Sequence, residues 1–407
     1  MPPTSGYDAP FAGLKVVDLS QGIAGPYCGM LLAQHGANVI KVEPVESGGD
    51  WTRILGHVYG DHTAFSIPGN LGKRSIALDL KSADGKAVLW RLLDDADVMM
   101  EGFRPGVIRR LGFDYETVAA RNKRILYLSV SGFGQSGPLS ERPAMDPVLQ
   151  AYTGLIMENK GTDGVPHRVP YIAVDMATAL YAFQALAPAI HARQRLDHGR
   201  YIETSLMQAA AGMQVVRMMG TYLEDGAEPV ASVPGGSFKT ADGWMQIAVV
   251  QQRDWVALCA AIDLPDLAAD PLFDTRERRI RNADALYAII RPAFAAMTCA
   301  DLDARLAKAG IMHERLNSYL EFLKQPHVEQ TGLIAWLAQT GLDRPAPVPN
   351  LPGPPPLESG TPRATAPTCG EHTRDILREH GYSAAEIAEL EGRGVVRCAT
   401  TLHKKAS

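Results

Sequence analysis

Asp175 is the residue of this 407-residue chain whose type and setting best fit chemistry. It is the single carboxylate in the stretch YIAVDMATAL at residues 171–180, where small and apolar residues predict a helix that Pro188 bends or ends. The helix dipole favours the ionised form of an acid near a helix N-terminus, as a carboxylate nucleophile requires. The alternative is an N-cap, whose side chain accepts hydrogen bonds from free backbone N–H groups. Asp175 is therefore a candidate nucleophile or a helix cap.

The elements that must position Asp175 alternate between strands and helices through the N-terminal half. This alternation predicts an α/β fold with a doubly wound, largely parallel sheet that helices cover on both faces. Ligands of such sheets bind at the carboxyl ends of the strands. The predicted strands are residues 14–19, 38–42, 75–80, 97–100 and 125–130, with helices near 22–34 and 84–95. The expected binding loops follow Leu19, Val42, Leu80, Met100 and Val130.

A second, smaller α+β domain is predicted downstream. The pattern on either side of Asp242-Gly243 predicts a β-hairpin over residues 237–249, and helices follow it. Nine of the 26 residues from 343 to 368 are proline, which predicts an extended strap that leads to two last helices. The chain is thus predicted to form a large domain, a small domain and a strap with helices that return to the large domain: residues 1–229, 230–325 and 326–407.

Composition and charge exclude several classes of protein. Apolar residues make up 46% and charged residues 21% of the chain, and the net charge is −5, which is typical of a soluble protein without a nucleic-acid partner. We expect no membrane partner and a cytoplasmic location, because neither a secretory signal nor an apolar stretch of membrane-spanning length is visible. The five cysteines lack metal-type spacing, and no H-E-x-x-H or Walker motif occurs, so we expect no metal site.

Eight short blocks occur in order along the chain in addition to the segment of Asp175. They are GLKVVDL at 13–19, AGP at 24–26, GANVIKVE at 36–43, GKRSIALDLK at 72–81, FRPG at 103–106, SGFGQSGP at 131–138, TADGW at 240–244 and GEHT at 370–373. In these blocks the chain resembles the class III coenzyme A transferases, a family that includes formyl-CoA transferase, carnitine CoA-transferase and α-methylacyl-CoA racemase. Asp175 falls on the family's catalytic aspartate.

The resemblance implies that CoA and acyl-CoA are substrates and that no cofactor is permanently bound. Asp175 would attack an acyl-CoA thioester to form a mixed anhydride, and the released CoA thiolate would return to give an aspartyl-CoA thioester. A carboxylate with a pKa near 4 is ionised at neutral pH, so we expect it to need no activating base. Gly235 and Gly236 either offer backbone donors to the oxyanion or form the turn into the hairpin.

The resemblance also assigns CoA-binding positions. Leu78 and Lys81 match positions at which formyl-CoA transferase contacts the nucleotide, and Phe103, Val107 and Arg110 match its next cluster. Lys81 and Arg110 suit phosphate oxygens, and Phe103 suits adenine. For each basic residue the alternative is an ordinary surface charge.

Two of three further substrate-binding candidates, Ile23 and Met145 but not Asp146, depart from the family's better-known members. Ile23 stands where formyl-CoA transferase has a glutamine. Met145, which Asp146 follows, stands where that enzyme has a tyrosine and where the racemase has its proton-transferring histidine. A thioether does not transfer protons near neutral pH, so transfer of CoA between carboxylic acids is favoured over racemisation.

Two alternatives to acyl-CoA:carboxylate transfer remain, a racemase-like proton-transfer enzyme and a CoA-binding protein without activity. The family implies an interlocked homodimer, with which the proline strap is compatible. Arg53, Arg142 and Arg168 are either surface arginines or recognise a second carboxylate on a dicarboxylic acid.

Overall fold

The computed structural model describes residues 8–161, 163–226 and 232–399. Contacts divide the chain into two compact units, one formed by Met1–Val215 with Thr331–Ser407 and the other by Val216–Gln330. The predicted boundary between residues 229 and 230 lies outside the described residues. The three predicted segments therefore stay a prediction.

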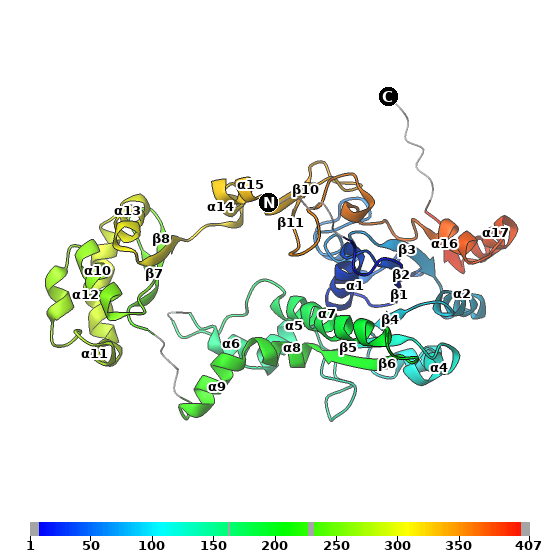
Figure 1. Ribbon diagram of the computed structural model, residues 1–407, viewed down its shortest axis with the longest axis horizontal. Coiled ribbons are helices and arrows are strands. Elements are labelled where there is room, and N and C mark those ends of the chain that lie inside the picture. Colours follow the sequence, from blue (N-terminus) through cyan, green and yellow to red (C-terminus); the bar gives the residue numbers. More distant parts are fainter. Residues whose placement is uncertain (1–7, 162, 227–231, 400–407) are drawn as a thin grey trace. The chain divides into compact units, whose positions relative to one another are not determined.

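A seven-stranded sheet forms the centre of the first unit (Figure 1). Its strand order is β12-β3-β2-β1-β4-β5-β6, and every neighbouring pair is parallel except β12 with β3. The predicted doubly wound, largely parallel α/β fold is confirmed. The order reverses between β1 and β4, which makes the carboxyl ends of these two strands the topological switch point where ligands bind. The strands are β1 (Lys15–Asp18), β2 (Asn38–Pro44), β3 (Arg74–Leu78), β4 (Val98–Glu101), β5 (Leu126–Ser131), β6 (Arg200–Ser205) and β12 (Val396–Arg397).

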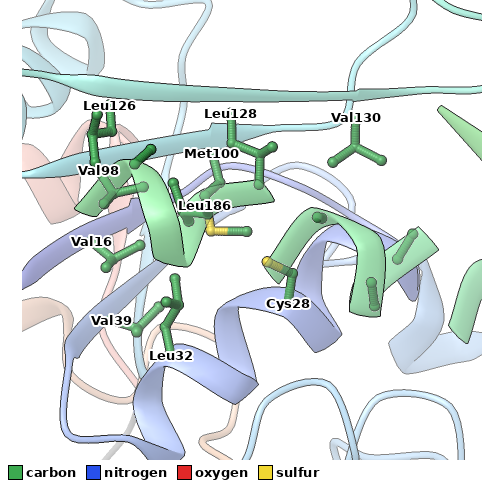
Figure 2. Close-up of a cluster of buried hydrophobic side chains, with 14 of the residues drawn as sticks. Val16, Cys28, Leu32, Val39, Val98, Met100, Leu126, Leu128, Val130 and Leu186 are labelled. Carbon is green, nitrogen blue, oxygen red and sulfur yellow. The ribbon is translucent and has the colours of Figure 1, made fainter. Parts of the chain in front are cut away.

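Helices cover both faces of this sheet because successive strand residues point to opposite sides. Val16 packs in one apolar cluster and its neighbour Val17 in another. Figure 2 shows the first cluster, where Cys28 and Leu32 of α1 and Leu186 of α7 meet the strands. The helices of this face are α1 (Ala24–Gln34), α7 (Ala173–Arg193) and α8 (Leu206–Met213). Those of the other face are α2 (Ala83–Leu93), α4 (Tyr115–Arg121), α16 (Thr373–Glu379) and α17 (Ala384–Gly392).

Helix α7 carries Asp175 and continues past Pro188 to Arg193. Pro188 therefore does not end the helix, because packing against α1, α8 and the sheet outweighs the loss of one backbone hydrogen bond. The predicted bend at Pro188 stays a prediction. By length and composition α7 is apolar enough to cross a membrane, and half of its apolar window is buried inside the fold. Its contacts are those of a core helix.

The C-terminal strap returns to the first unit and pairs with itself. Strand β11 (Ala346–Pro349) lies antiparallel to β10 (Ile334–Leu337), and both pack on Met30, Leu31 and Leu71. The predicted extended strap thus contains a strand. The short elements of this unit are η1 (Trp51–Ile54), α3 (Val107–Leu111), α5 (Asp146–Tyr152), α6 (Leu155–Glu158) and η3 (Pro362–Ala364).

The second unit is α+β, as predicted. The predicted hairpin is present, and an additional strand makes a three-stranded antiparallel sheet around a core that includes Trp255 and Phe294. Its strands are β7 (Gly235–Lys239), β8 (Trp244–Ala248) and β9 (Met312–Arg315). Its helices are α9 (Val215–Leu223), α10 (Gln252–Ala261), η2 (Pro265–Ala269), α11 (Arg276–Arg281), α12 (Ala283–Ala295), α13 (Cys299–Ala309), α14 (Tyr319–Phe322) and α15 (Pro326–Thr331).

Candidate active site

A cavity of about 180 Å³ lies at the switch point of the large sheet. The loops after β1, β4 and β5 line it, together with Asp175 from α7. Two of the predicted substrate positions, Ile23 and Met145, line the same cavity. The structure therefore brings the candidate nucleophile and these two positions together. Trp51, Arg104, Ser131, Ser140 and Arg142 also line the cavity and were not predicted as a group.

Asp175 lies in the first turn of α7, and its side chain is partly exposed where it faces the cavity. Ile172 occupies the N-cap position of this helix, and its side chain makes no capping hydrogen bond. The alternative in which Asp175 is the N-cap is therefore wrong.

Asp146 caps the first turn of α7 from a different helix. Its Oδ2 accepts hydrogen bonds from the backbone N–H groups of Val174, at 2.7 Å, and of Asp175, at 3.1 Å. Its Oδ1 accepts a hydrogen bond from Gln150 Nε2 at 2.6 Å. The Asp146 side chain is buried behind the cavity wall, whereas its neighbour Met145 is 54% exposed. Asp146 thus holds the turn that carries the candidate nucleophile, whereas the sequence suggested a contact with substrate.

Burial, with the negative charge of Asp146 as a second cause, raises the pKa of Asp175 to about 7. The expectation of an ordinary pKa near 4 is wrong, because these two effects outweigh the favourable helix dipole. Asp175 is therefore less fully ionised at neutral pH than an ordinary aspartate. The raised pKa also makes the carboxylate a stronger base, and strongly perturbed acids in cavities are typical of functional sites.

The N-terminus of α1 forms another wall of the cavity. Ile23, the N-cap residue, provides no side-chain capping hydrogen bond, and Ala24 and Gly25 line the cavity beside it. The first N–H groups of a helix have no partner within the helix, and they favour anions. Only glycine fits at position 25, because a Cβ there would come within 2.3 Å of the Ser20 side chain.

Buried ion pairs fix the loop after β1 and the segment that follows β2. Lys41 and Asp50, whose side chains are fully buried, lie 2.9 Å apart, and Asp50 accepts a hydrogen bond from Gly22 N at 3.1 Å. Arg53 donates to both carboxylate oxygens of Glu43, at 2.7 and 2.8 Å. The Arg53 guanidinium is therefore engaged inside the protein and is not positioned to recognise a substrate carboxylate.

Four of the five predicted CoA-binding residues line a second cavity of about 250 Å³: Leu78, Lys81, Phe103 and Val107. Gln21 and Phe103 line both this cavity and the cavity that Asp175 lines, which is the candidate catalytic cavity, so the two are neighbours. The fifth residue, Arg110, is an exposed residue of α3, the same short helix as Val107, but does not line the cavity. The Lys81 side chain is 76% exposed and forms an ion pair with Glu46.

Gly235 and Gly236 lie in β7 of the second unit, and the hairpin turn is at Asp242-Gly243. The alternative in which these glycines form a turn into the hairpin is wrong, because both belong to its first strand. The hydroxyl of Tyr287 donates to Gly235 O at 3.0 Å. Their role as oxyanion donors stays a prediction. Within the described ranges, no group of three or more His, Cys, Asp or Glu side chains could hold a metal ion.

The fold and the cavity define an α/β protein with a candidate carboxylate nucleophile at the switch point of its sheet. Residues 11–373 match the CoA-transferase family III, and the chain belongs to this family.

Relatives with different named activities are similar to this chain over most of its length. The acetyl-CoA:oxalate CoA-transferase of Acetobacter aceti is 34% identical over 340 residues, which are 82% of this chain and 86% of that protein. The succinyl-CoA:glutarate CoA-transferase of Mus musculus is 29% identical over 399 residues, 95% of this chain and 90% of that protein.

A relative of known structure is Rv3272 of Mycobacterium tuberculosis, named a probable fatty acyl-CoA transferase, which is 31% identical over 330 residues, 76% of this chain and 83% of that protein. Its orthorhombic crystal structure has a TM-score of 0.80 and 28% identity, covering 91% of this chain and all of that chain, 100%. The relatives agree on transfer of CoA and differ in the acids that their names specify.

Proposed function

We propose that this protein transfers CoA from an acyl-CoA to a carboxylic acid through a covalent intermediate on Asp175. The observation that carries the proposal is the position of this side chain. Asp175 is the one carboxylate among the described residues that line the cavity at the switch point. Family membership supports the use of CoA thioesters. The interlocked homodimer and the cytoplasmic location that the sequence suggested belong to the same proposal.

The reaction begins when an Asp175 carboxylate oxygen attacks the thioester carbon. The tetrahedral intermediate collapses to a mixed anhydride and expels the CoA thiolate. The thiolate then attacks the aspartyl carbonyl of the anhydride, which releases the donor acid and leaves an aspartyl-CoA thioester. The acceptor carboxylate attacks this thioester, forms a second anhydride and again frees the thiolate. Attack of the thiolate on the acceptor carbonyl gives the new acyl-CoA and restores Asp175.

Two features of the cavity support this chemistry. The backbone N–H groups of Ala24 and Gly25, at the start of α1, suit the oxyanion of each tetrahedral intermediate. Arg104 and Arg142, which line the same cavity, suit the incoming carboxylate. The cavity beside Phe103 suits the remainder of CoA, with its apolar walls against the adenine and Lys81 at its exposed edge.

Two measurements distinguish the proposed function from racemisation: transfer of CoA between acids, and exchange of the α-carbon proton with solvent. We expect labelled CoA to move between an acyl-CoA and a free carboxylic acid, because Asp175 supplies a nucleophile and Met145 supplies no proton. The measurement is mass spectrometry of a panel of acyl-CoA donors and acids in D₂O. Deuterium at C2 of a 2-methylacyl-CoA, without transfer, would move the assignment to the racemase. Binding of CoA without either reaction would indicate a protein that has lost activity.

Substitution of Lys81 or Arg110 by alanine should raise the KM for acyl-CoA about three- to tenfold. The expected effect is moderate because both side chains are exposed, and water and salt weaken such charge–phosphate contacts. The kcat at saturation should hardly change, since phosphates remote from the thioester bind alike in the ground and transition states. Lys123→Ala is the matched control. This lysine is also exposed, but it precedes β5 and therefore lies at the amino end of a strand, whereas Lys81 follows the carboxyl end of β3. Unchanged KM in both variants would make these positions ordinary surface charges.

A further inference from the structure

An apolar cavity of about 320 Å³ borders the catalytic cavity. Ile23 lines both, and Ile172 and Met176, on either side of the Asp175 turn, line the apolar cavity. We propose that this cavity holds an apolar acyl chain, so that the substrates are acyl-CoAs and monocarboxylic acids with an extended aliphatic tail. The proposal rests on the proposed transfer of CoA at Asp175. The N-terminal part of the wall consists of Ile23, Tyr27, Met30, Ala64, Phe65, Pro68, Gly69 and Leu71.

The C-terminal strap forms another part of the wall of this cavity. Pro347, Val348 and Pro349 of β11 line it, with Leu351 and Leu357 from the segment that follows. All of the lining residues belong to the same compact unit as Asp175. The cavity is therefore built by the fold that positions the nucleophile.

The order of the three cavities matches the order of groups in an acyl-CoA. The cavity beside Lys81 shares Gln21 and Phe103 with the catalytic cavity, and the catalytic cavity shares Ile23 with the apolar one. An acyl-CoA is a linear molecule, with the nucleotide at one end, the thioester next to the acyl group and the acyl tail at the other end. A thioester at Asp175 with its nucleotide toward Lys81 thus directs its tail past Ile23.

The chemistry of the lining selects the kind of tail. No charged side chain lines the cavity among the described residues, and the phenol of Tyr27 is its one ionisable group. A terminal carboxylate placed there would lose its hydration without a cationic partner, which is strongly unfavourable. The volume is about twice the roughly 150 Å³ of an apolar cavity that binds benzene, so a tail of several methylene groups fits. Dicarboxylic acids are therefore expected to be poor substrates.

The test compares acyl-CoA donors that differ only in their tails, with the wild-type protein and one acceptor. From acetyl-CoA to octanoyl-CoA, kcat/KM should rise about three- to fourfold for each methylene that enters the cavity. Hexanoyl-CoA should exceed adipyl-CoA, which has the same chain length and a terminal carboxylate, by about tenfold or more. A flat series, or a preference for adipyl-CoA, would overturn the proposal and indicate another occupant, such as a segment of a second copy of the chain.

Variants locate the effect in this cavity. Ala64→Phe adds a ring to an exposed position of the wall and should lower the octanoyl-to-acetyl ratio of kcat/KM about tenfold. Phe65→Ala widens the cavity and should shift the optimum toward longer tails. Ala120→Phe, an exposed substitution on α4 that does not line the cavity, should leave the ratio unchanged. Equal ratios in wild type and in both cavity variants, with folding checked by circular dichroism, would contradict the assignment.

Binding separates failure of this inference from failure of the proposed function. Calorimetry on the Asp175→Ala variant, which cannot form the intermediate, should give a dissociation constant for octanoyl-CoA at least tenfold below that for acetyl-CoA. Absence of transfer with this difference intact would overturn the function and leave the tail site standing. Transfer with equal dissociation constants and a flat donor series would overturn the tail site alone.

Discussion

Replacement of Asp175 by alanine or asparagine should lower kcat for CoA transfer by roughly 10⁴-fold or more. Neither residue has a carboxylate that could form the covalent intermediate. CoA affinity should be largely retained, since the predicted CoA contacts lie in the neighbouring cavity. Wild-type protein incubated with a donor and then treated with hydroxylamine or borohydride should carry the modification at Asp175, as peptide mass spectrometry would show. The exposed Asp266 offers a matched control, and Asp266→Asn should behave as wild type. Full activity of Asp175→Ala would refute the mechanism.

The raised pKa of Asp175 also predicts that Asp175→Asn, which loses activity, gains stability against unfolding. Its folded pKa of about 7 exceeds the unfolded value near 4, so the folded state binds the proton more tightly and stability falls as pH rises between these values. Asparagine carries no charge and avoids this loss. Asp175→Asn should therefore unfold less readily than wild type above pH 7, by about 1–3 kcal/mol once solvent in the cavity is allowed for. Chemical denaturation at pH 5 and pH 8 would test this, with a difference expected mainly at pH 8.

The strands of the large sheet could be predicted because their signal is local. Apolar runs between turn residues identified β1 to β5, whereas β6, with the sequence RYIETS, carries polar residues at the sheet edge and has no such run. The two-residue β12 is defined only by its pairing with β3. Helix α7 continues past Pro188, which local propensity did not predict because it gives no information on the packing that holds the helix together.

Some features of the site could likewise be predicted from the sequence and others could not. Asp175, Ile23 and Met145 were found from the family's pattern, and the structure places all three around one cavity. The raised pKa of Asp175 was out of reach, because it depends on burial and on Asp146, which is 29 residues distant in sequence. The apolar cavity was missed for a related reason, since its walls come from α1, the segment after η1, α7 and the strap.

Asp146→Ala should destabilise the fold by about 2–3 kcal/mol, because it removes the acceptor for two backbone N–H groups at the start of α7 and leaves them buried. Asp146→Asn keeps an acceptor oxygen but removes the charge, so its loss of stability should be smaller. Asp114→Ala is the control, because Asp114 is the N-cap of its own helix α4, accepts a hydrogen bond from Thr117 N and does not line the cavity. Denaturant titration of the three variants would rank them.

Asp146→Asn and Asp114→Ala also test what sets the pKa of Asp175. The negative charge of Asp146 disfavours ionisation of Asp175, so in Asp146→Asn the pKa of Asp175 should fall. In wild type, kcat/KM should rise with pH through about 7 as Asp175 ionises, and in Asp146→Asn this rise should occur at lower pH. At pH 6 the variant should therefore keep a larger fraction of its own activity at pH 8 than wild type does. An unshifted pH profile in Asp146→Asn, with Asp114→Ala also unshifted, would mean that burial alone raises the pKa and that Asp146 acts on the helix and not on the charge of Asp175.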